Sequence, residues 1–409
     1  MTTALEFQNV DILFSRERGR DGRTRIRRAL ESLDAGQSRA EIQAENGVIV
    51  GVAGASLVVS RGHISVLMGL SGSGKSTLLR AANRLNPVTR GRVLLADGDA
   101  ITDVASCDAS TLRRLRRGTI AMMFQQFGLL PWRTVRDNVG FGLELRGESA
   151  ATRRRVVDEK LELVGLAQWA DRHVAELSGG MQQRVGLARA FATDADVLLM
   201  DEPFSALDPL IRTKLQDELC QLQARVRKTI LFVTHDLDEA LKLGNQISVL
   251  QGGRIVQTGA AEDIVLRPAD GYVAEFVQHM NPLTVLTGHM VMTPRAVLGT
   301  QDGAVALDPE GRYRVTLGPA GEPVAVRGPG GALALLPVPV PGGAPTPGPG
   351  IAVVPVSAPL RWLIQLQRQT GHPVLLTEGG AFAGSCGPGE VIRALSTGDA
   401  APKQANAAN

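Results

Sequence analysis

Hydrophobic residues over positions 1 to about 283 form short apolar runs that end in polar residues and alternate with longer stretches of helix-forming residues. ISVLMG, DVLLMD and TILFVTH have the length of buried strands, whereas KSTLLRAANRL has the length and residue types of a helix. This alternation is typical of an α/β domain with an open parallel sheet. Because such sheets bind ligands at the carboxyl ends of their strands, the polar residues that end these runs are the first candidates for chemistry.

Two stretches of this domain depart from the alternation. Residues 126–178 are rich in helix formers and predict a helical subdomain. Residues 15–47 interrupt two strands that are expected to pair, and they contain an arginine-rich turn followed by sequence typical of two short helices. The arginines of this insert either approach anionic lipid headgroups or form a solvated loop; they are Arg16, Arg18, Arg20, Arg23, Arg25, Arg27 and Arg28.

The composition changes from about residue 284 onward. Residues 318–350 are rich in proline and glycine, and we expect them to form a linker without regular structure. Residues 358–396 read as helix, strand, hairpin strand and helix. The expected units are therefore a domain at 1–283, an accessory region at 284–395 and a disordered tail at 396–409.

Composition agrees with a cytosolic globular protein. The 409 residues allow two or three domains, and a formal net charge of +3 is too small to indicate nucleic acid as the main partner. Cys107, Cys220 and Cys386 lack metal-ligand spacing and are expected to be reduced thiols. The start, MTTALEFQNV, has no secretory pattern, and the longest apolar run, VIVGVAGASLVV, is shorter than the roughly 18 to 20 residues of a membrane span.

Gly69 to Ser76 match the phosphate-loop pattern G-x-x-x-x-G-K-[ST], with a predicted strand before it and a helix after it. Gly72 and Gly74 allow backbone N–H groups to curl around phosphates, Lys75 is expected to reach the β and γ oxygens, and Ser76 to hold Mg²⁺. The alternative is a turn that is merely rich in glycine and serine. Such a turn would not need a strand directly before it and a helix directly after it, and the sequence predicts both.

Asp201 and Glu202 follow the apolar strand VLLM. A carboxylate at a buried strand end is costly unless it meets a cation, and Mg²⁺ on Ser76 supplies one for Asp201. Glu202 is then placed to orient and deprotonate an attacking water. Without the phosphate loop, this pair would be read as a helix cap or a surface pair.

His235 and Gln125 also follow apolar runs. A single histidine at a strand end is often structural, and a single glutamine in a loop carries no functional signal. Since His235 ends a strand of the same predicted sheet as Asp201, we expect it to contact the γ-phosphate and the water.

The stretch LSGGMQQR is a second helix start suited to an anion. Ser178 is a predicted N-cap, and Gly179 and Gly180 leave the first turn open to close approach. The chain thus has two phosphate-binding patterns for one nucleotide.

The ordered set GLSGSGKST, MFQQFGLLPW, LSGGMQQR, VLLMDEPFSALD and VTHDLDEA resembles the nucleotide-binding subunit of ABC transporters over residues 1 to about 280. The resemblance implies a P-loop ABC-type ATPase core with an antiparallel β subdomain and a helical subdomain, which binds ATP and Mg²⁺ between two copies of the chain. It makes Gln125 the loop residue that joins Mg²⁺ to the membrane partner, Asp208 a dimer contact, His235 the switch histidine and Phe14 the aromatic that stacks on adenine.

The resemblance gives a full set of expected site residues. The catalytic residues are Lys75, Gln125, Glu202 and His235, and the Mg²⁺ ligands are Ser76, Gln125 and Asp201. The nucleotide-binding residues are Phe14, Gly69, Ser71, Gly72, Ser73, Gly74, Lys75, Ser76, Thr77, Ser178, Gly179, Gly180, Gln182 and Asp208. Ser178 to Gly180 would face the γ-phosphate bound by the opposite copy.

The insert after the first strand, together with VASCDASTLRRLR and VAEFVQHMNPLTVL, is similar to the branch that energises import of choline, glycine betaine and proline betaine. Such subunits work at the cytoplasmic face of the membrane, with a separate permease and an extracytoplasmic substrate-binding protein. VMTPRAVL and residues 358–396 resemble fragments of CBS modules, so the C-terminal region is expected to be a small α+β unit of degenerate CBS type.

Three other classes share parts of these patterns. DNA-repair and translation-factor relatives carry coiled coils, zinc inserts or tandem ATPases, none of which the sequence contains. The insert at residues 15–47, which is similar to that of the quaternary-amine branch, argues against an exporter or lipid-transport ATPase. A regulatory module that does not hydrolyse ATP disagrees with the presence of both Glu202 and His235.

Overall fold

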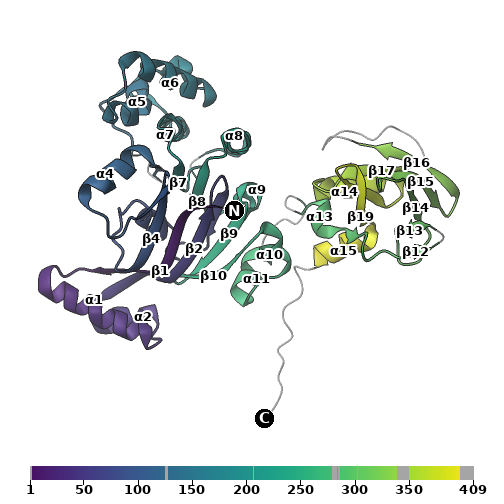
Figure 1. Ribbon diagram of the computed structural model, residues 1–409, viewed down its shortest axis with the longest axis horizontal. Helices are drawn as coiled ribbons and strands as arrows, with labels where there is room; N and C mark the ends of the chain where they lie inside the picture. Colours follow the sequence, from purple (N-terminus) through teal and green to yellow (C-terminus); the bar gives the residue numbers. More distant parts are fainter. Residues whose placement is uncertain are drawn as a thin grey trace, which may run out of the picture. The chain divides into compact units, whose positions relative to one another are not determined.

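The computed structural model describes residues 2–124, 128–205, 207–278, 283, 286–301, 303–338 and 350–396. The chain forms two compact units, Met1–Ala269 and Asp270–Asn409 (Figure 1). The division falls before the predicted boundary at 283/284 and places α11 (Gly271–Gln278) in the second unit.

The first unit contains a six-stranded sheet in the order β10-β9-β3-β8-β7-β6, counted over its described residues. Strands β9, β3, β8, β7 and β6 run parallel, and β10 is an antiparallel edge. Of the four inner strands, β3, β8 and β7 are buried throughout, which explains their uninterrupted apolar sequences. The strands are β3 (Ile64–Met68), β6 (Ile120–Met123), β7 (Val197–Asp201), β8 (Thr229–Val233), β9 (Gln246–Gln251) and β10 (Arg254–Gly259).

A second sheet, with the order β2-β1-β4-β5, is antiparallel and confirms the predicted antiparallel subdomain. Its strands are β1 (Thr3–Ser15), β2 (Val48–Ser60), β4 (Arg90–Asp97) and β5 (Ala100–Asp103). Phe7 and Val93 from this sheet share one buried cluster with Leu67 and Leu199 of the parallel sheet and Leu79 of α3 (Lys75–Ala81). The two sheets therefore share one hydrophobic core.

The predicted insert between β1 and β2 is helical, as expected. It comprises α1 (Gly19–Asp34), which is longer than the short helix predicted, and α2 (Arg39–Asn46). Ala29, Leu33 and Ile42 pack against Val48 and Val50 of β2 in a cluster of their own. The arginines of the run are all exposed, which agrees with both interpretations given for them.

Helices cover the remaining parts of the unit (Figure 1). The predicted helical subdomain is confirmed by α5 (Val135–Leu145) and α6 (Ala150–Leu163), with short 3-10 turns at Ala167–Trp169 and Val174–Glu176. The other helices are α4 (Ala109–Gly118), α7 (Gly179–Ala192), α8 (Pro209–Val226), α9 (Leu237–Leu243) and α10 (Ala261–Leu266). In the part of the chain that the structure describes, no helix has the length and apolar character needed to span a membrane.

The second unit has a nine-stranded sheet in the order β11-β19-β18-β17-β16-β15-β14-β13-β12 over its described residues. The predicted order over 358–396 is confirmed by α14 (Leu360–Thr370), β18 (Val374–Glu378), β19 (Ala381–Cys386) and α15 (Pro388–Ser396). The other elements are α13 (Gly288–Val291), β11 (Thr293–Pro294), β12 (Thr300–Gln301), β13 (Ala304–Ala306), β14 (Arg314–Leu317) and β17 (Gly350–Pro355). The unit is α+β, and its likeness to CBS modules stays a prediction.

The prediction of an unstructured linker over 318–350 is wrong for its first part. β15 (Pro323–Gly328) and β16 (Gly331–Pro337) form an antiparallel pair there. Val326 and Leu333 are partners in this pair and pack in the core of the unit, and Pro323 is tolerated because it is the first residue of its strand. Residues 339–349 and 397–409, which include most of the predicted tail, lie outside the described residues.

Candidate functional site

The phosphate loop lies between β3 and α3, as its sequence predicts. Gly69, Gly72 and Gly74 have φ angles of +142°, +76° and +102°, which side-chain-bearing residues rarely adopt. A Cβ on Gly69 would lie 2.2 Å from the carbonyl oxygen of Leu250, and one on Gly74 would lie 2.5 Å from that of Gly51. The loop is therefore closely packed against neighbouring backbone and requires glycine at both positions.

Lys75 is 5% exposed, and its ammonium group lies inside the loop. Nζ donates hydrogen bonds to the carbonyl oxygens of Gly69 (2.7 Å) and Leu70 (2.9 Å). Burial lowers the pKa of Lys75, and the negative charges of Glu202 and Asp201 oppose this effect. The ammonium thus has neutral oxygen partners that phosphate oxygens are able to replace.

Ser73 provides a test of whether the loop fits an oxygen-rich ligand. Its side chain is 5% exposed, yet its hydroxyl oxygen has no hydrogen-bond partner among the residues that the structure describes. A buried hydroxyl without a partner is costly, and a phosphate at the loop would supply acceptor oxygens. The loop residues therefore fit a nucleotide.

Ser76 and Asp201 meet at the carboxyl end of β7. The Ser76 hydroxyl donates to Oδ1 of Asp201 at 2.6 Å, and Asp201 has no exposed surface. Arg80 pairs with the other carboxylate oxygen at 2.9 Å. A hydroxyl next to a carboxylate is a donor set that suits Mg²⁺, which usually keeps waters and phosphate oxygens as its remaining ligands. Gln125, the third predicted Mg²⁺ ligand, lies outside the described residues.

Glu202 and His235 form a contact beside this pair. Oε2 of Glu202 lies 3.3 Å from Nδ1 of His235, with side-chain exposures of 16% and 59%. Glu202 has a φ of +48°, and its N–H donates to the carbonyl oxygen of Val233 at 3.0 Å. A positive φ at a residue with a side chain stores strain, which is common at functional sites.

Ser178 caps α7, as predicted. Its hydroxyl accepts a hydrogen bond from the N–H of Met181 at 3.4 Å, and a Cβ on Gly179 would meet nothing within 4 Å. A Cβ on Gly180 would lie 3.3 Å from Cδ2 of Leu207. The start of this helix therefore keeps one open side and lies near the loop that follows Glu202.

Two neighbouring glutamines have contacts that the sequence did not reveal. Nε2 of Gln182 donates to the carbonyl oxygens of Val174 and Leu177, both at 3.1 Å, so this nitrogen braces the turn before α7. A nucleotide contact through it would require these bonds to break, and it stays a prediction. Gln183 is fully buried and donates to the carbonyl oxygen of Pro203, which links α7 to the loop after β7.

The predicted adenine contact, Phe14, is half-buried near the end of β1. A Cβ on Gly51 would lie 2.8 Å from Cε2 of Phe14 and 3.0 Å from Cγ2 of Thr77 on α3. Phe14 and Thr77 therefore approach the same glycine, next to the helix that follows the phosphate loop. Stacking on adenine at this place stays a prediction.

Arg39 and Asp208 complete the surroundings. Arg39, the first residue of α2 in the insert, places NH1 3.5 Å from the carbonyl oxygen of Gly72, and no sequence signal pointed to it. Asp208 is the N-cap of α8 and accepts from the N–H of Ile211 at 3.0 Å. This capping bond lies within one copy of the chain, so the contact of Asp208 with a second copy stays a prediction.

A phosphate loop joined to a strand-end aspartate, with a second carboxylate and a histidine beside it, defines the class of P-loop nucleoside triphosphatases. The ABC transporter family model matches residues 52–205. The glycine betaine/carnitine transport ATP-binding protein GbuA of Listeria monocytogenes is 47% identical over 277 residues, which cover 68% of this chain and 69% of GbuA. The glycine betaine/proline betaine transport system ATP-binding protein ProV of Escherichia coli is 51% identical over 249 residues, 61% of each chain.

Solved structures agree with these sequence relatives. The dimeric structure of a post-hydrolysis state of the ATP-binding cassette MJ0796 bound to ADP and Pi aligns with a TM-score of 0.52 and 28% identity. The alignment covers 63% of this chain and 98% of MJ0796. The chain belongs to the ABC transporter family and is an ABC-type ATPase that binds ATP.

Proposed function

We propose that the chain is the ATP-hydrolysing subunit that energises import of a quaternary amine osmolyte, of the glycine betaine or choline type, through a separate membrane permease. The observation that carries the hydrolytic part is the contact of Glu202 with His235 beside the pair of Ser76 and Asp201. The proposed substrate class is supported by the relatives GbuA and ProV, which are named for betaine transport.

In this proposal, Lys75 and the backbone N–H groups of residues 71–76 bind the β- and γ-phosphates, and Phe14 stacks on adenine. Ser76, Asp201 and Gln125 would hold Mg²⁺, and the ion would supply positive charge that neutralises the phosphate oxygens. Because Asp201 is fully buried and already accepts a hydrogen bond from Ser76, its carboxylate is held in one orientation before any nucleotide arrives.

Glu202 orients the attacking water and accepts its proton. The imidazole of His235 lies within hydrogen-bond reach of Glu202 and is more than half exposed, so it is able to contact both the water and the γ-phosphate. The positive φ of Glu202 and its N–H bond to the carbonyl oxygen of Val233 fix its backbone directly after β7, and its carboxylate contacts His235. The arrangement supports in-line hydrolysis, in which the chain supplies position and charge.

A second copy of the chain would complete each site. Ser178 and Gly179 would present the open N-terminus of α7 to the γ-phosphate bound by the opposite copy, and Asp208 would contact the dimer partner. The dimeric form of MJ0796 supports this proposal. The lack of a Cβ at Gly179 matters because any side chain there would separate phosphate from the helix end.

The remaining partners are an integral membrane permease and an extracytoplasmic substrate-binding protein, which place the chain at the cytoplasmic face of the membrane. The test is to copurify the complex, reconstitute it in vesicles and measure ATP hydrolysis with candidate solutes. We expect glycine betaine or choline to stimulate hydrolysis, and taurine or a sugar to have no effect. Stimulation by taurine or a sugar without any response to a quaternary amine would contradict the substrate class.

A further inference from the structure

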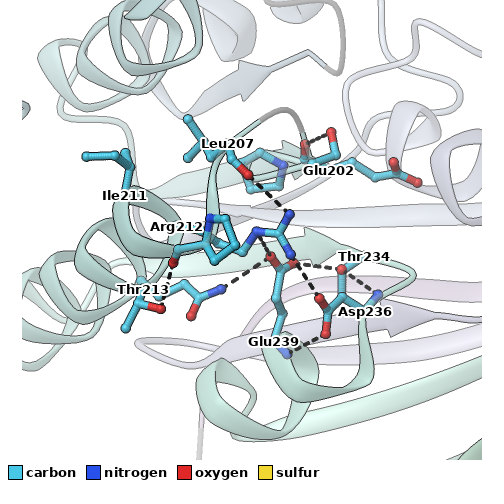
Figure 2. Close-up of polar contacts among 12 residues, drawn as sticks. Glu202, Leu207, Ile211, Arg212, Thr213, Thr234, Asp236 and Glu239 are labelled. Atoms are coloured by element: carbon cyan, nitrogen blue, oxygen red, sulfur yellow. Dashed lines mark hydrogen bonds and ion pairs between the residues drawn. The ribbon is translucent and has the colours of Figure 1, made fainter. Parts of the chain in front are cut away.

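Arg212, in the first turn of α8, contacts two segments that surround the site (Figure 2). Its NH2 group donates to the carbonyl oxygen of Leu207 at 3.3 Å, and NH1 donates to Oδ2 of Asp236 at 3.3 Å. Nε lies 3.9 Å from Oε1 of Glu239. Hydrogen bonds that involve ionised groups are stronger and more directional than neutral ones, so one guanidinium links both segments.

The first segment contains His235, and the residues on either side of it are fixed. The Thr234 hydroxyl donates to Oε2 of Glu239 at 2.7 Å and accepts from the N–H of Asp236 at 2.9 Å. Oδ1 of Asp236 accepts from the N–H of Glu239 at 3.2 Å and caps α9. Both carboxylates that meet Arg212 therefore determine where the backbone of His235 lies.

Glu239 is the buried member of this network. It is 5% exposed and also accepts a hydrogen bond from Nε2 of Gln216 at 3.2 Å. Burial raises the pKa of Glu239, whereas its bond to Thr234 and the charge of Arg212 act in the opposite direction. A buried carboxylate needs these partners, so loss of Arg212 disturbs Glu239 and, through it, Thr234.

The second segment is the loop from Glu202 to Asp208. The carbonyl oxygen of Glu202 accepts from the N–H of Ser205 (3.4 Å) and from its hydroxyl (3.0 Å). Leu207, near the other end of the loop, supplies the carbonyl oxygen that Arg212 binds. The general base and the predicted dimer contact thus lie at the two ends of one loop, and Arg212 binds that loop next to Asp208.

We propose that Arg212 is a positioning residue that couples the loop ending at Asp208 to the segment carrying His235. Approach of a second copy at Asp208 then favours the contact of His235 with Glu202, and loss of that contact weakens the dimer interface. Arg212 acts through His235 and has no contact with nucleotide in this scheme. The inference rests on the proposed function, because it assumes that Glu202 and His235 act in hydrolysis.

The test is a double-mutant cycle in the full chain between R212M and H235A, with kcat and KM for ATP measured in single and double variants. R212M removes the guanidinium and keeps a side chain of similar length. K214M is the matched control, because Lys214 lies on the same helix, is 70% exposed and pairs only with Glu218 among the described residues. We expect R212M to lower kcat about tenfold, to change KM for ATP less than about twofold, and K214M to behave as wild type.

If Arg212 acts through His235, R212M adds no more than about a twofold loss in the H235A background. R212K retains one charged contact and is expected to recover part of kcat. A lower Tm in R212M than in K214M would mean that R212M also destabilises the fold. The same cycle is then measured with R212K in place of R212M, and it decides whether Arg212 acts through His235.

Three results would overturn the inference. A wild-type kcat in R212M would contradict the coupling and leave the proposed function standing. The same conclusion follows if H235A alone has a lower kcat and the fold losses in kcat of R212M and H235A multiply in the double variant. A wild-type rate in H235A alone would contradict both the role of His235 and the coupling that depends on it.

Discussion

Oγ of Ser76 lies 2.6 Å from Oδ1 of Asp201, although 125 residues separate the two in the chain. The parallel sheet produces this contact because the carboxyl ends of β3 and β7 lie at the same edge, and α3 starts directly after the phosphate loop. Arg80, four residues after Ser76 on the same helix, binds the other oxygen of Asp201. The carboxylate is therefore held next to the Ser76 hydroxyl, in an arrangement that suits the proposed Mg²⁺ site.

D201N tests this carboxylate. Loss of its charge leaves Arg80 without its ionic partner, and we expect the free energy of unfolding to fall by about 2 kcal/mol. We also expect Mg²⁺ to lose most of its effect on ATP binding and hydrolysis to fall at least about a hundredfold, measured by titration with and without Mg²⁺. D97N is the matched control, because Asp97 accepts from Thr119 and Arg114 away from the loop. Equal Mg²⁺ dependence in wild type and D201N would contradict the assignment.

K75M tests the buried ammonium through its pH dependence. Because burial lowers the pKa of Lys75, the unfolded state binds more protons than the folded state at pH values just below the ordinary pKa of 10.5. The free energy of unfolding of the nucleotide-free wild type should therefore increase relative to that of K75M as the pH rises toward 10.5. Urea unfolding of both proteins between about pH 8 and pH 10.5 measures the difference. A difference that is constant over this range would argue against a buried, charged Lys75.

S178R tests whether the start of α7 faces a second copy. We expect ATP binding to remain close to wild type, and hydrolysis to be abolished because a bulky cation separates the two copies. S149R is the matched control, since Ser149 caps α6 by accepting from the N–H of Thr152 at 3.2 Å. Both changes remove one cap and should cost about 1 kcal/mol of stability. Loss of hydrolysis in both variants would indicate damage to the helical subdomain instead of an interface.

R39Q tests the contact between the insert and the phosphate loop. Arg39 adds positive charge 3.5 Å from the carbonyl oxygen of Gly72, so we expect R39Q to raise KM for ATP about threefold at low salt and less at high salt. R28Q, an equal charge change at an exposed position of α1, should leave KM unchanged. If both variants raise KM equally, the effect comes from the overall charge of the insert and not from the contact.

The parts of the site that follow from local sequence were predictable. The glycines at 69, 72 and 74 require φ values that the motif encodes, and Asp201, Glu202 and His235 end apolar strands whose length already indicated burial. Parallel pairing then brings these ends together without further information. Ser178 was equally predictable, because N-cap preference is a local property of the helix start.

Other residues have no local signal. Arg80, Gln183 and Arg212 are ordinary polar residues within helices, and their partners come from strands and loops that are distant in sequence. The strand pair β15 and β16 was missed for a related reason, because composition over 318–350 hides the pairing of Val326 with Leu333. In both cases tertiary contacts outweigh local propensity.

The central claim is that Glu202 is the general base of an ATPase that works as a dimer. The most direct measurement is light scattering coupled to size-exclusion chromatography of E202Q with Mg²⁺ and ATP, together with its rate of phosphate release. The account predicts an ATP-dependent dimer and a rate at least about a thousandfold below wild type, because binding is retained and proton transfer is lost. A monomer that hydrolyses ATP at the wild-type rate would contradict it.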